Sequence, residues 1–302
     1  MSDRLNERLQ WGWGFSALRP HQRQAIEATL AGRDSLVILP TGGGKSICFQ
    51  LPALVGEGPC LVVSPLIALM EDQVQAARQA VSAAALHSDL PPQAQGQIMR
   101  DYQAGHIRLL YTSPERLAHS RLIEDLKQYP PALIAIDEAH CISSWGHDFR
   151  PEYRQLATLL DSLKAPRMAL TATATPKVAD DIAGQLRLDH PLRIIAPVQR
   201  ANLCLRTLPR QDRRQQISDL LNTRRGQCGI VYCRRRKDTE ELADYFAGQG
   251  HRCAPFHAGL PAEQKSQTLA AFMQDRLDLV FATVAFGMGI DRPDVRFVVH
   301  AA

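Results

Sequence analysis

One short stretch constrains the fold of this chain more than any other, Leu39-Pro40-Thr41-Gly42-Gly43-Gly44-Lys45-Ser46. It follows an apolar run at residues 35–39 that is typical of a buried strand, and it precedes residues 47–51, which we expect to open a helix. A strand, a glycine-rich loop and a helix in this order form the setting of a phosphate-binding loop. We therefore expect an α/β domain that binds the phosphates of a nucleotide.

The residues of this loop have distinct parts in phosphate binding. The stretch 41–44 lets backbone N–H groups close around the phosphates, where the helix N-terminus also favours negative charge. Lys45 can reach the β- and γ-phosphates, and the Ser46 hydroxyl can ligate Mg²⁺. The strict motif has a further glycine at position 39, where this chain has leucine. A glycine-rich turn with an exposed lysine is therefore the alternative interpretation.

Length and composition favour a soluble globular protein of two domains. At 302 residues the chain is long enough for two, and 45% hydrophobic with 22% charged residues is ordinary for that class. No apolar run approaches the roughly 18 residues of a membrane span, and residues 1–4 lack the layout of a signal peptide. The seven scattered cysteines predict reduced core thiols. A net charge of +4 is compatible with nucleic-acid binding without establishing it.

Apolar runs alternate with helical patterns along the chain, which predicts parallel sheets covered by helices. After the first strand, further strands are expected at 59–64, 83–87, 107–112, 133–136, 168–171 and 193–196, with helices at 69–80 and 93–104. A second alternation has strands at 228–233, 251–257, 278–282 and 296–300, with helices at 237–248 and 262–274. Residues 197–216 between them lose periodicity and gather arginines, so we expect a domain boundary there. Two such domains favour a nucleotide held in a cleft between them.

Asp137 and Glu138 are the second chemical signal. They directly follow the apolar run at 133–136, and an acid at the carboxyl end of a central strand lies beside the phosphate loop in a doubly wound sheet. Asp137 is placed to hold Mg²⁺, and Glu138 is placed to orient and deprotonate the attacking water. An acidic strand end with ordinary solvation is the alternative. The pair predicts hydrolysis of a nucleoside triphosphate and does not indicate what that hydrolysis drives.

Three residues just upstream of the loop can recognise an adenine. Phe15 offers a stacking face, and the side chains of Arg19 and Gln22 offer donors and an acceptor for the edge of the base. On chemistry alone this signal is weak. Trp11 and Trp13 in the same region are interpreted as core residues.

The motifs at 41–46, 137–140 and 170–174 together resemble those of superfamily 2 helicases. The aromatic-rich stretch at 139–153 resembles the corresponding loop of RecQ-type DNA helicases. The resemblance extends from residue 15 to residue 300 and implies two RecA-like parallel-sheet domains in tandem, at 1–200 and 201–302. RecQ-type chains continue past the position of His300 into a motif whose arginines reach ATP. We therefore expect the second domain to be truncated before that motif.

The resemblance also implies roles for individual residues. Phe15, Arg19 and Gln22 match the adenine-recognition motif. Residues implied to line the track of a single strand are Ser64, Pro65, Ser113 and Thr283. Residues implied to link the ATP site to strand contacts are His140, Thr171 and Thr173. Residues of the second domain implied to face the nucleotide are Gly287 and Asp291.

The side chains of the aromatic-rich stretch indicate a function by their chemistry alone, independently of the resemblance. Trp145 and Phe149 are large rings flanked by His147 and Arg150, and rings on a loop can stack on bases for roughly 1–3 kcal/mol per base. The alternative is that both rings anchor a long loop to the core. The run at 234–236 is three arginines, for which solvation is the default and phosphate contact is the alternative.

The sequence as a whole predicts an ATP- and Mg²⁺-dependent DNA helicase of RecQ type. The resemblance alone implies movement from 3′ to 5′, action on single-stranded and partly duplex DNA, and a part in DNA repair and recombination. We expect a cytoplasmic, nucleoid-associated monomer without a membrane partner. One alternative is an RNA helicase. The other is a non-catalytic module that binds ATP and DNA without turnover, which the expected truncation favours.

Overall fold

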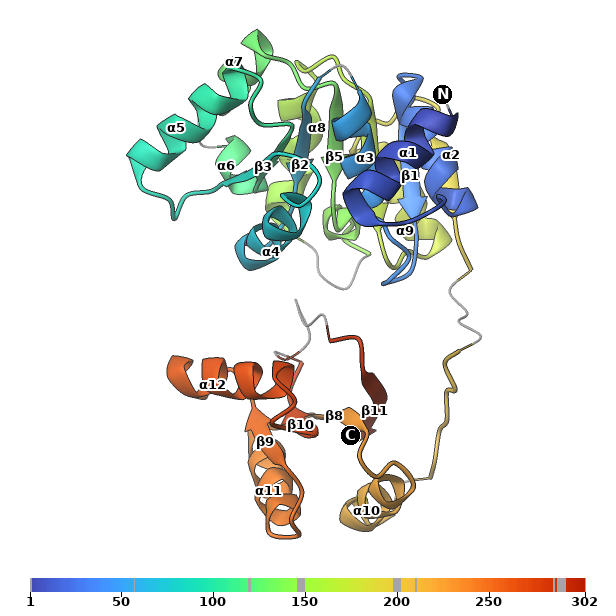
Figure 1. The fold of residues 1–302 in the computed structure, drawn as a ribbon, viewed down its shortest axis with the longest axis vertical. Coiled ribbons are helices and arrows are strands. Elements are labelled where there is room, and N and C mark those ends of the chain that lie inside the picture. The colour runs from blue at the N-terminus through green and yellow to red at the C-terminus, as the bar shows by residue number, and fades with distance from the viewer. Residues whose placement is uncertain are drawn as a thin grey trace. The chain divides into compact units, whose positions relative to one another are not determined.

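The computed structural model describes residues 2–56, 58–118, 121–145, 150–197, 202–209, 211–284, 286 and 292–301. The chain divides into two compact units, Met1–Leu203 and Cys204–Ala302 (Figure 1). Four of the predicted site residues, His147, Phe149, Gly287 and Asp291, lie outside the described residues.

The first unit is built on a seven-stranded sheet with the order β3-β4-β2-β5-β6-β1-β7. Every pair of neighbouring strands in it is parallel. Its strands are β1 Ser35–Ile38, β2 Cys60–Val63, β3 Ala83–Leu86, β4 Leu109–Thr112, β5 Leu133–Ile136, β6 Arg167–Thr171 and β7 Leu192–Ile195. The strand runs are short and apolar because both faces of the sheet are covered, which confirms the predicted α/β class.

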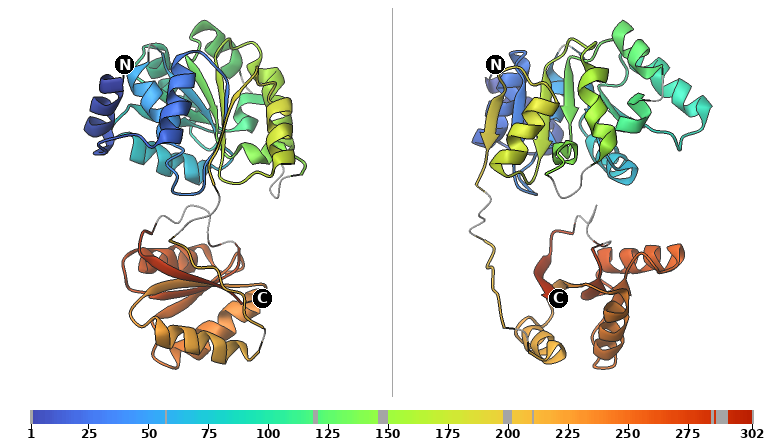
Figure 2. Two further views of the ribbon diagram at one scale, coloured as in Figure 1. Left: turned by 90° about the vertical axis from the view of Figure 1, so that its right-hand side faces the viewer. Right: turned by 180° about the vertical axis from the view of Figure 1, so that it is seen from behind.

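Helices cover both faces of this sheet (Figure 2). Side chains alternate along each strand, so Leu36 and Ile38 of β1 enter one core while Val37 enters the other. The helices on the Val37 face are α2 Pro20–Leu30, α3 Ile47–Val55 and α4 Ile67–Ala77. Those on the opposite face are α5 Pro92–Gln103, α6 Pro114–Ala118, α7 Leu122–Gln128, α8 Leu156–Leu160 and α9 Pro176–Gln185. Helix α1, Ser2–Trp13, packs on α2 and α3, and the short 3-10 helices η1, Ala139–Ile142, and η2, Pro151–Gln155, follow β5.

The second unit is a smaller parallel sheet with the order β11-β8-β10-β9. Its strands are β8 Cys228–Cys233, β9 Cys253–Phe256, β10 Leu279–Ala282 and β11 Val295–Ala301. Helices α10, Arg213–Thr223, and α11, Arg236–Ala247, pack on one face, and α12, Ala262–Met273, packs on the other. The strands of both predicted alternations are therefore present as parallel sheets.

Three expectations, two about single residues and one about the start of a helix, were wrong. Trp11 is 66% exposed on α1 rather than in the core, because Leu5 and Leu9 form the buried stripe of that helix. Cys204 is exposed, although the other cysteines are buried or half-buried free thiols. Helix α10 begins inside the stretch predicted to lack periodicity, where Asp212 caps it by accepting hydrogen bonds from the next turn. Within the described residues, no helix combines the length and apolar character needed to cross a membrane.

Candidate nucleotide and nucleic-acid site

Strand order places three functional segments side by side at one edge of the first sheet. Strand β6 lies between β1 and β5. The phosphate loop follows β1, Thr171 is the last residue of β6, and the acidic pair follows β5. The backbone N–H of Leu39 donates to the carbonyl oxygen of Thr171 at 3.1 Å, which ties the start of the loop to β6. Ligands of open α/β sheets bind at this carboxyl edge.

The backbone conformation of the phosphate loop requires glycine at two positions. Gly42 and Gly44 have φ angles of +74° and +76°, in the left-handed region that favours glycine. A Cβ atom on Gly44 would lie 2.2 Å from Nε2 of Gln22. Lys45 is half-buried, and its Nζ donates to the carbonyl oxygen of Leu39 at 3.3 Å. The Lys45 ammonium group therefore lies against the loop, where it is predicted to bind the phosphates of a nucleotide.

Two of the three residues predicted to recognise adenine, Arg19 and Gln22, lie against this loop. Arg19 Nη1 donates to the carbonyl oxygen of Gly42 at 3.0 Å, and Gln22 Nε2 lies 3.3 and 3.2 Å from the carbonyl oxygens of the next two residues. Gln22 Oε1 also accepts the backbone N–H of Arg19 at 2.9 Å. The ring of Phe15 is 53% exposed, which leaves it open for stacking. Arg19 and Gln22 therefore support the loop, and Phe15, four residues before Arg19, exposes its ring.

The acidic pair is held by buried partners. Asp137 is 4% exposed, its Oδ2 accepts Nε2 of Gln73 at 3.1 Å, and its carbonyl oxygen accepts the hydroxyl of Tyr153 at 3.2 Å. Burial raises the pKa of Asp137, the charge of Glu138 raises it further, and nearby Lys45 opposes both effects. A bound cation would relieve this penalty on the ionised carboxyl, so the carboxylate fits the predicted Mg²⁺ site.

A chain of polar contacts leads from Glu138 to β6. Glu138 has φ +46° and ψ +43°, an uncommon backbone conformation for a residue with a side chain. Its Oε2 lies 3.2 Å from Nδ1 of buried His140, and that nitrogen lies 2.9 Å from Oγ1 of Thr171. The Thr171 hydroxyl in turn donates to the carbonyl oxygen of Thr173 at 3.2 Å. The structure thus brings together the residues predicted to couple the ATP site to strand contacts.

The segment after η1 carries the candidate stacking surface. Trp145 is 63% exposed, and its backbone N–H donates to Oγ of Ser143 at 3.2 Å. Ser143 Oγ donates to Oδ2 of Asp181 at 2.6 Å, which fixes the segment to α9. Arg150 Nη1 donates to the carbonyl oxygen of Pro65 at 2.8 Å, which joins two of the motifs predicted to contact DNA. An indole this exposed contributes little to core packing, so the geometry favours the stacking interpretation for Trp145.

Three residues predicted to line the strand track, Ser64, Pro65 and Ser113, are buried. Ser64 is fully buried at the end of β2, and Ser113 is 7% exposed. The Ser113 hydroxyl accepts the backbone N–H of Arg116 at 3.2 Å and so supports the start of α6. Neither hydroxyl offers an exposed surface to a nucleic acid in this arrangement. Any contact with DNA from this edge therefore depends more on Trp145 and Arg150.

Thr283 and the arginines at 234–236, the candidate residues of the second unit that the structure describes, lie at the carboxyl edge of its sheet. Thr283 follows β10, and its backbone N–H donates to the carbonyl oxygen of Phe256 at 3.1 Å. The neighbouring Val284 is 88% exposed. The arginines at 234–236 are exposed around the start of α11, which leaves both solvation and phosphate contact open to them.

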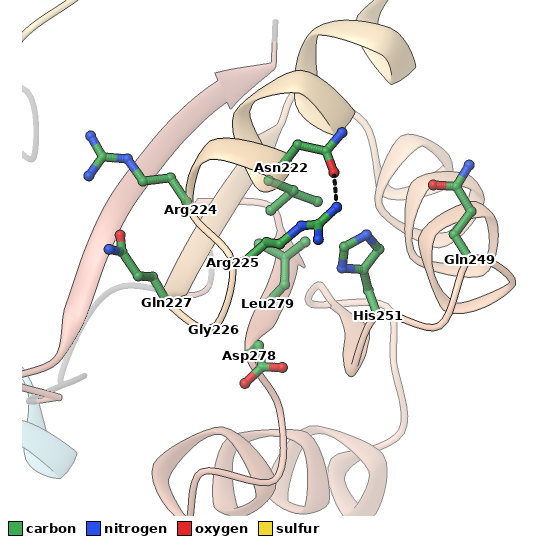
Figure 3. Close-up of a pocket in the computed structure, with 10 residues that line it drawn as sticks. Asn222, Arg224, Arg225, Gly226, Gln227, Gln249, His251, Asp278 and Leu279 are labelled. Atoms are coloured by element: carbon green, nitrogen blue, oxygen red, sulfur yellow. Dashed lines mark hydrogen bonds between the residues drawn. The ribbon is translucent and has the colours of Figure 1, made fainter.

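A cavity of about 420 Å³ lies at the opposite, amino edge of the second sheet (Figure 3). Its polar wall includes Arg224, Arg225 and His251, and Arg225 donates to Oδ1 of Asn222 at 3.4 Å. None of the predicted site residues that the structure describes lines it. Within the described part of the chain, no group of three or more His, Cys, Asp or Glu side chains is placed to hold a metal ion.

Sequence reasoning missed the partners of several site residues. Gln73 received no role of its own from the sequence, and its amide supports Asp137. Tyr153 closed the aromatic-rich stretch, and its hydroxyl instead holds the backbone of Asp137. Lys177 lay outside every motif, yet its Nζ lies 3.1 Å from the centroid of the Trp145 ring. Local patterns contain no signal for such pairings.

Comparisons with known proteins agree with this geometry. The model of the DEAD/DEAH box helicase family matches residues 19–182, and that of the helicase conserved C-terminal domain matches residues 212–302. The ATP-dependent DNA helicase RecQ of Pasteurella multocida is 42% identical over 290 residues, which cover 95% of this chain and 46% of the relative. The probable ATP-dependent DNA helicase RecS of Bacillus subtilis is 42% identical over 307 residues, which cover 98% and 61%. The chain spans about half the length of the curated relatives it matches.

A solved structure shows the same fold. The helicase Lhr of Mycobacterium smegmatis, bound to single-stranded DNA and AMP-PNP, aligns over 95% of this chain and 42% of its own, with a TM-score of 0.68 at 23% identity. At that identity the likeness concerns the fold alone. The family model covers more than half of the chain, and the phosphate loop and acidic pair lie inside the match. The chain therefore belongs to the DEAD/DEAH box helicases of superfamily 2, and within them to the RecQ type.

Proposed function

We propose that this chain acts as an ATP-dependent DNA helicase, hydrolysing ATP at the edge of the first sheet in order to move along single-stranded DNA. The observation that carries the proposal is the chain of contacts from Glu138 through His140 to Thr171, beside the segment that exposes Trp145. The buried histidine contacts the candidate catalytic carboxylate through its ring, and its carbonyl oxygen accepts the backbone N–H of Ser143, in the segment of Trp145, at 3.1 Å. Relatives named as ATP-dependent DNA helicases support the same activity.

The chemistry at the phosphate loop follows from the residues present. Lys45 and the backbone of the loop bind the phosphates, and Phe15 and Arg19 bind the adenine. Ser46 and Asp137 would hold Mg²⁺, which neutralises charge on the β- and γ-phosphates when bound. The Glu138 carboxylate takes the proton of the attacking water, and its contact with His140 connects it to Thr171.

Contacts between the Trp145 segment and α9 can also transmit DNA binding to the ATP site. A base that stacks on Trp145 changes the position of a segment held to α9 by Ser143 and Asp181. Helix α9 follows Thr171 and Thr173 directly in the chain. DNA binding can therefore alter the orientation of His140 and of the Glu138 carboxylate, which would make hydrolysis depend on DNA. Movement from 3′ to 5′, unwinding of duplex and a part in repair belong to the proposal through the RecQ-type resemblance.

The test measures phosphate release with and without nucleic acid. We expect single-stranded DNA to stimulate ATP hydrolysis strongly and single-stranded RNA to stimulate it weakly, with Glu138→Gln as the inactive control that still binds ATP. Equal stimulation by RNA would favour an RNA helicase. An absence of turnover with either polymer, in protein that binds both ATP and DNA, would favour the non-catalytic module. Duplexes with a 3′ or a 5′ single-stranded tail then test polarity, because a 3′ to 5′ motor unwinds the first and not the second.

A further inference from the structure

A cationic side chain of the protein itself lies over the ring of Trp145. Lys177, an exposed residue in the first turn of α9, places its Nζ 3.1 Å from the centroid of the indole. An ammonium group over a tryptophan face is attracted by the ring quadrupole, and at an exposed site the contact favours the bound form about two- to fivefold. The contact is specific in geometry and weak enough to exchange.

Helix α9 builds this contact together with a second one. Lys177 and Asp181 are four residues apart, so both side chains lie on the same face of the helix. Asp181 accepts from Ser143, whose hydroxyl accepts the backbone N–H of Trp145. The backbone of Trp145 is thereby fixed to α9 in a position that brings its ring to Lys177.

The acidic side chains near Lys177 on α9 are engaged elsewhere. Asp180 pairs with Arg193 at 2.5 Å, and Asp181 accepts from Ser143 at 2.6 Å. These carboxylates therefore leave the ammonium group on the ring, in solvent and available to another anion.

We propose that Lys177 is a DNA-binding residue that leaves the Trp145 ring and contacts a backbone phosphate when a base stacks on that ring. This inference rests on the proposed function, in which Trp145 stacks on DNA. The covered ring face has room for the ammonium group or for a base but not for both. Base stacking favours the complex about five- to 150-fold and so displaces the weaker cation contact. The displaced ammonium remains attached to α9, next to a strand whose phosphates attract it.

The first experiment is the salt dependence of binding to single-stranded DNA, measured for the wild-type chain, Lys177→Ala and Lys177→Arg. One lost phosphate contact lowers the slope of log K against log salt by about 0.7 for a single strand. The alanine variant should therefore lose about fivefold in relative affinity for each tenfold fall in salt, and the arginine variant should restore the slope. Near 1 M salt the alanine variant should bind as tightly as wild type or up to about fivefold more tightly, because the cation no longer competes with the base. Lys164→Ala, which removes another exposed lysine of the first unit, is the matched control and should leave the slope unchanged.

Parallel salt plots for wild type and Lys177→Ala would overturn the proposal, as would an equal change of slope in Lys164→Ala. The second experiment isolates the ring contact in the absence of DNA. In a Trp11→Phe, Trp13→Phe background, Trp145 is the remaining tryptophan, and Lys177→Ala should increase its quenching by neutral acrylamide. Unchanged quenching would show that Lys177 does not cover the ring. The proposed function fails separately, if Trp145→Ala leaves DNA affinity and DNA stimulation unchanged.

Discussion

The contact between Gln73 and Asp137 makes the stability of the first unit depend on pH in a defined way. Burial and the charge of Glu138 raise the pKa of Asp137, and the hydrogen bond from Gln73 lowers it. Gln73→Leu removes a hydrogen bond to a charged group, which is worth about 1.5–3 kcal/mol. The folded-state pKa of Asp137 should therefore rise further in the variant.

The sign of the effect follows from linkage. A carboxyl whose folded-state pKa lies above its unfolded value supports stability while it is protonated, and that support is lost as the pH rises through the folded-state pKa. At a pH below the raised folded-state pKa of Asp137, the carboxyl is protonated in both folded proteins, so Gln73→Leu removes no hydrogen bond to a charged group there. Toward neutral pH the variant should lose about 1.5–3 kcal/mol of unfolding free energy relative to its value in acid.

Urea unfolding followed by tryptophan fluorescence measures this directly. Trp11, Trp13 and Trp145 all lie in the first unit, so the signal reports that unit. Nucleotide is omitted and a chelator is present, which keeps Asp137 free of added ligands. The matched control is Gln97→Leu, which removes an amide that donates to exposed Asp101 at 3.0 Å and should show little dependence on pH. A cost in Gln73→Leu that is the same at every pH would refute the argument, since it would show that the amide does not interact with the ionised carboxyl.

Further substitutions test the remaining parts of the site. Glu138→Gln should retain ATP affinity and lower turnover by at least about a hundredfold, because an amide cannot take the proton of the attacking water; normal turnover per bound ATP would exclude that role. His140→Ala should leave basal ATP hydrolysis within about threefold and abolish most DNA stimulation, since the contact between Glu138 and Thr171 is cut; a steady-state assay with and without DNA measures both, and equal loss of both would indicate a purely catalytic part. Gly44→Ala should weaken ATP binding at least about tenfold, because a φ of +76° strains a residue with a side chain and a Cβ atom would displace Gln22 Nε2, 2.2 Å away, from the loop; calorimetric titration with a non-hydrolysable analogue measures it, and unchanged affinity would refute the argument. Trp145→Ala should reduce DNA affinity about five- to 150-fold with little change in melting temperature, as expected for an exposed ring; a large fall in melting temperature would instead support a core-anchor role.

Much of the fold was predictable because its signals are local. Buried strands such as Leu133–Ile136 are uninterrupted apolar runs, and the phosphate loop needs its glycines within a few residues of each other. The short helices α6, α7 and α8 were not predicted, because five to seven residues are too few to show helical periodicity. Helix α10 was missed for a different reason, since its arginine-rich start concealed the capping residue Asp212.

The sequence by itself determined the class of fold, the phosphate loop, the acidic pair and the family, because each depends on residue types at short spacing. Only the tertiary structure decided which distant side chains complete the site. Gln73 meets Asp137 across 64 positions, Arg150 meets Pro65 across 85, and Thr171 reaches the phosphate loop because β6 lies between β1 and β5. The order of parallel strands and the docking of α9 depend on how whole faces pack, and no local pattern encodes that packing. For the same reason, the position of Lys177 over the Trp145 ring emerged only when both elements were placed in space.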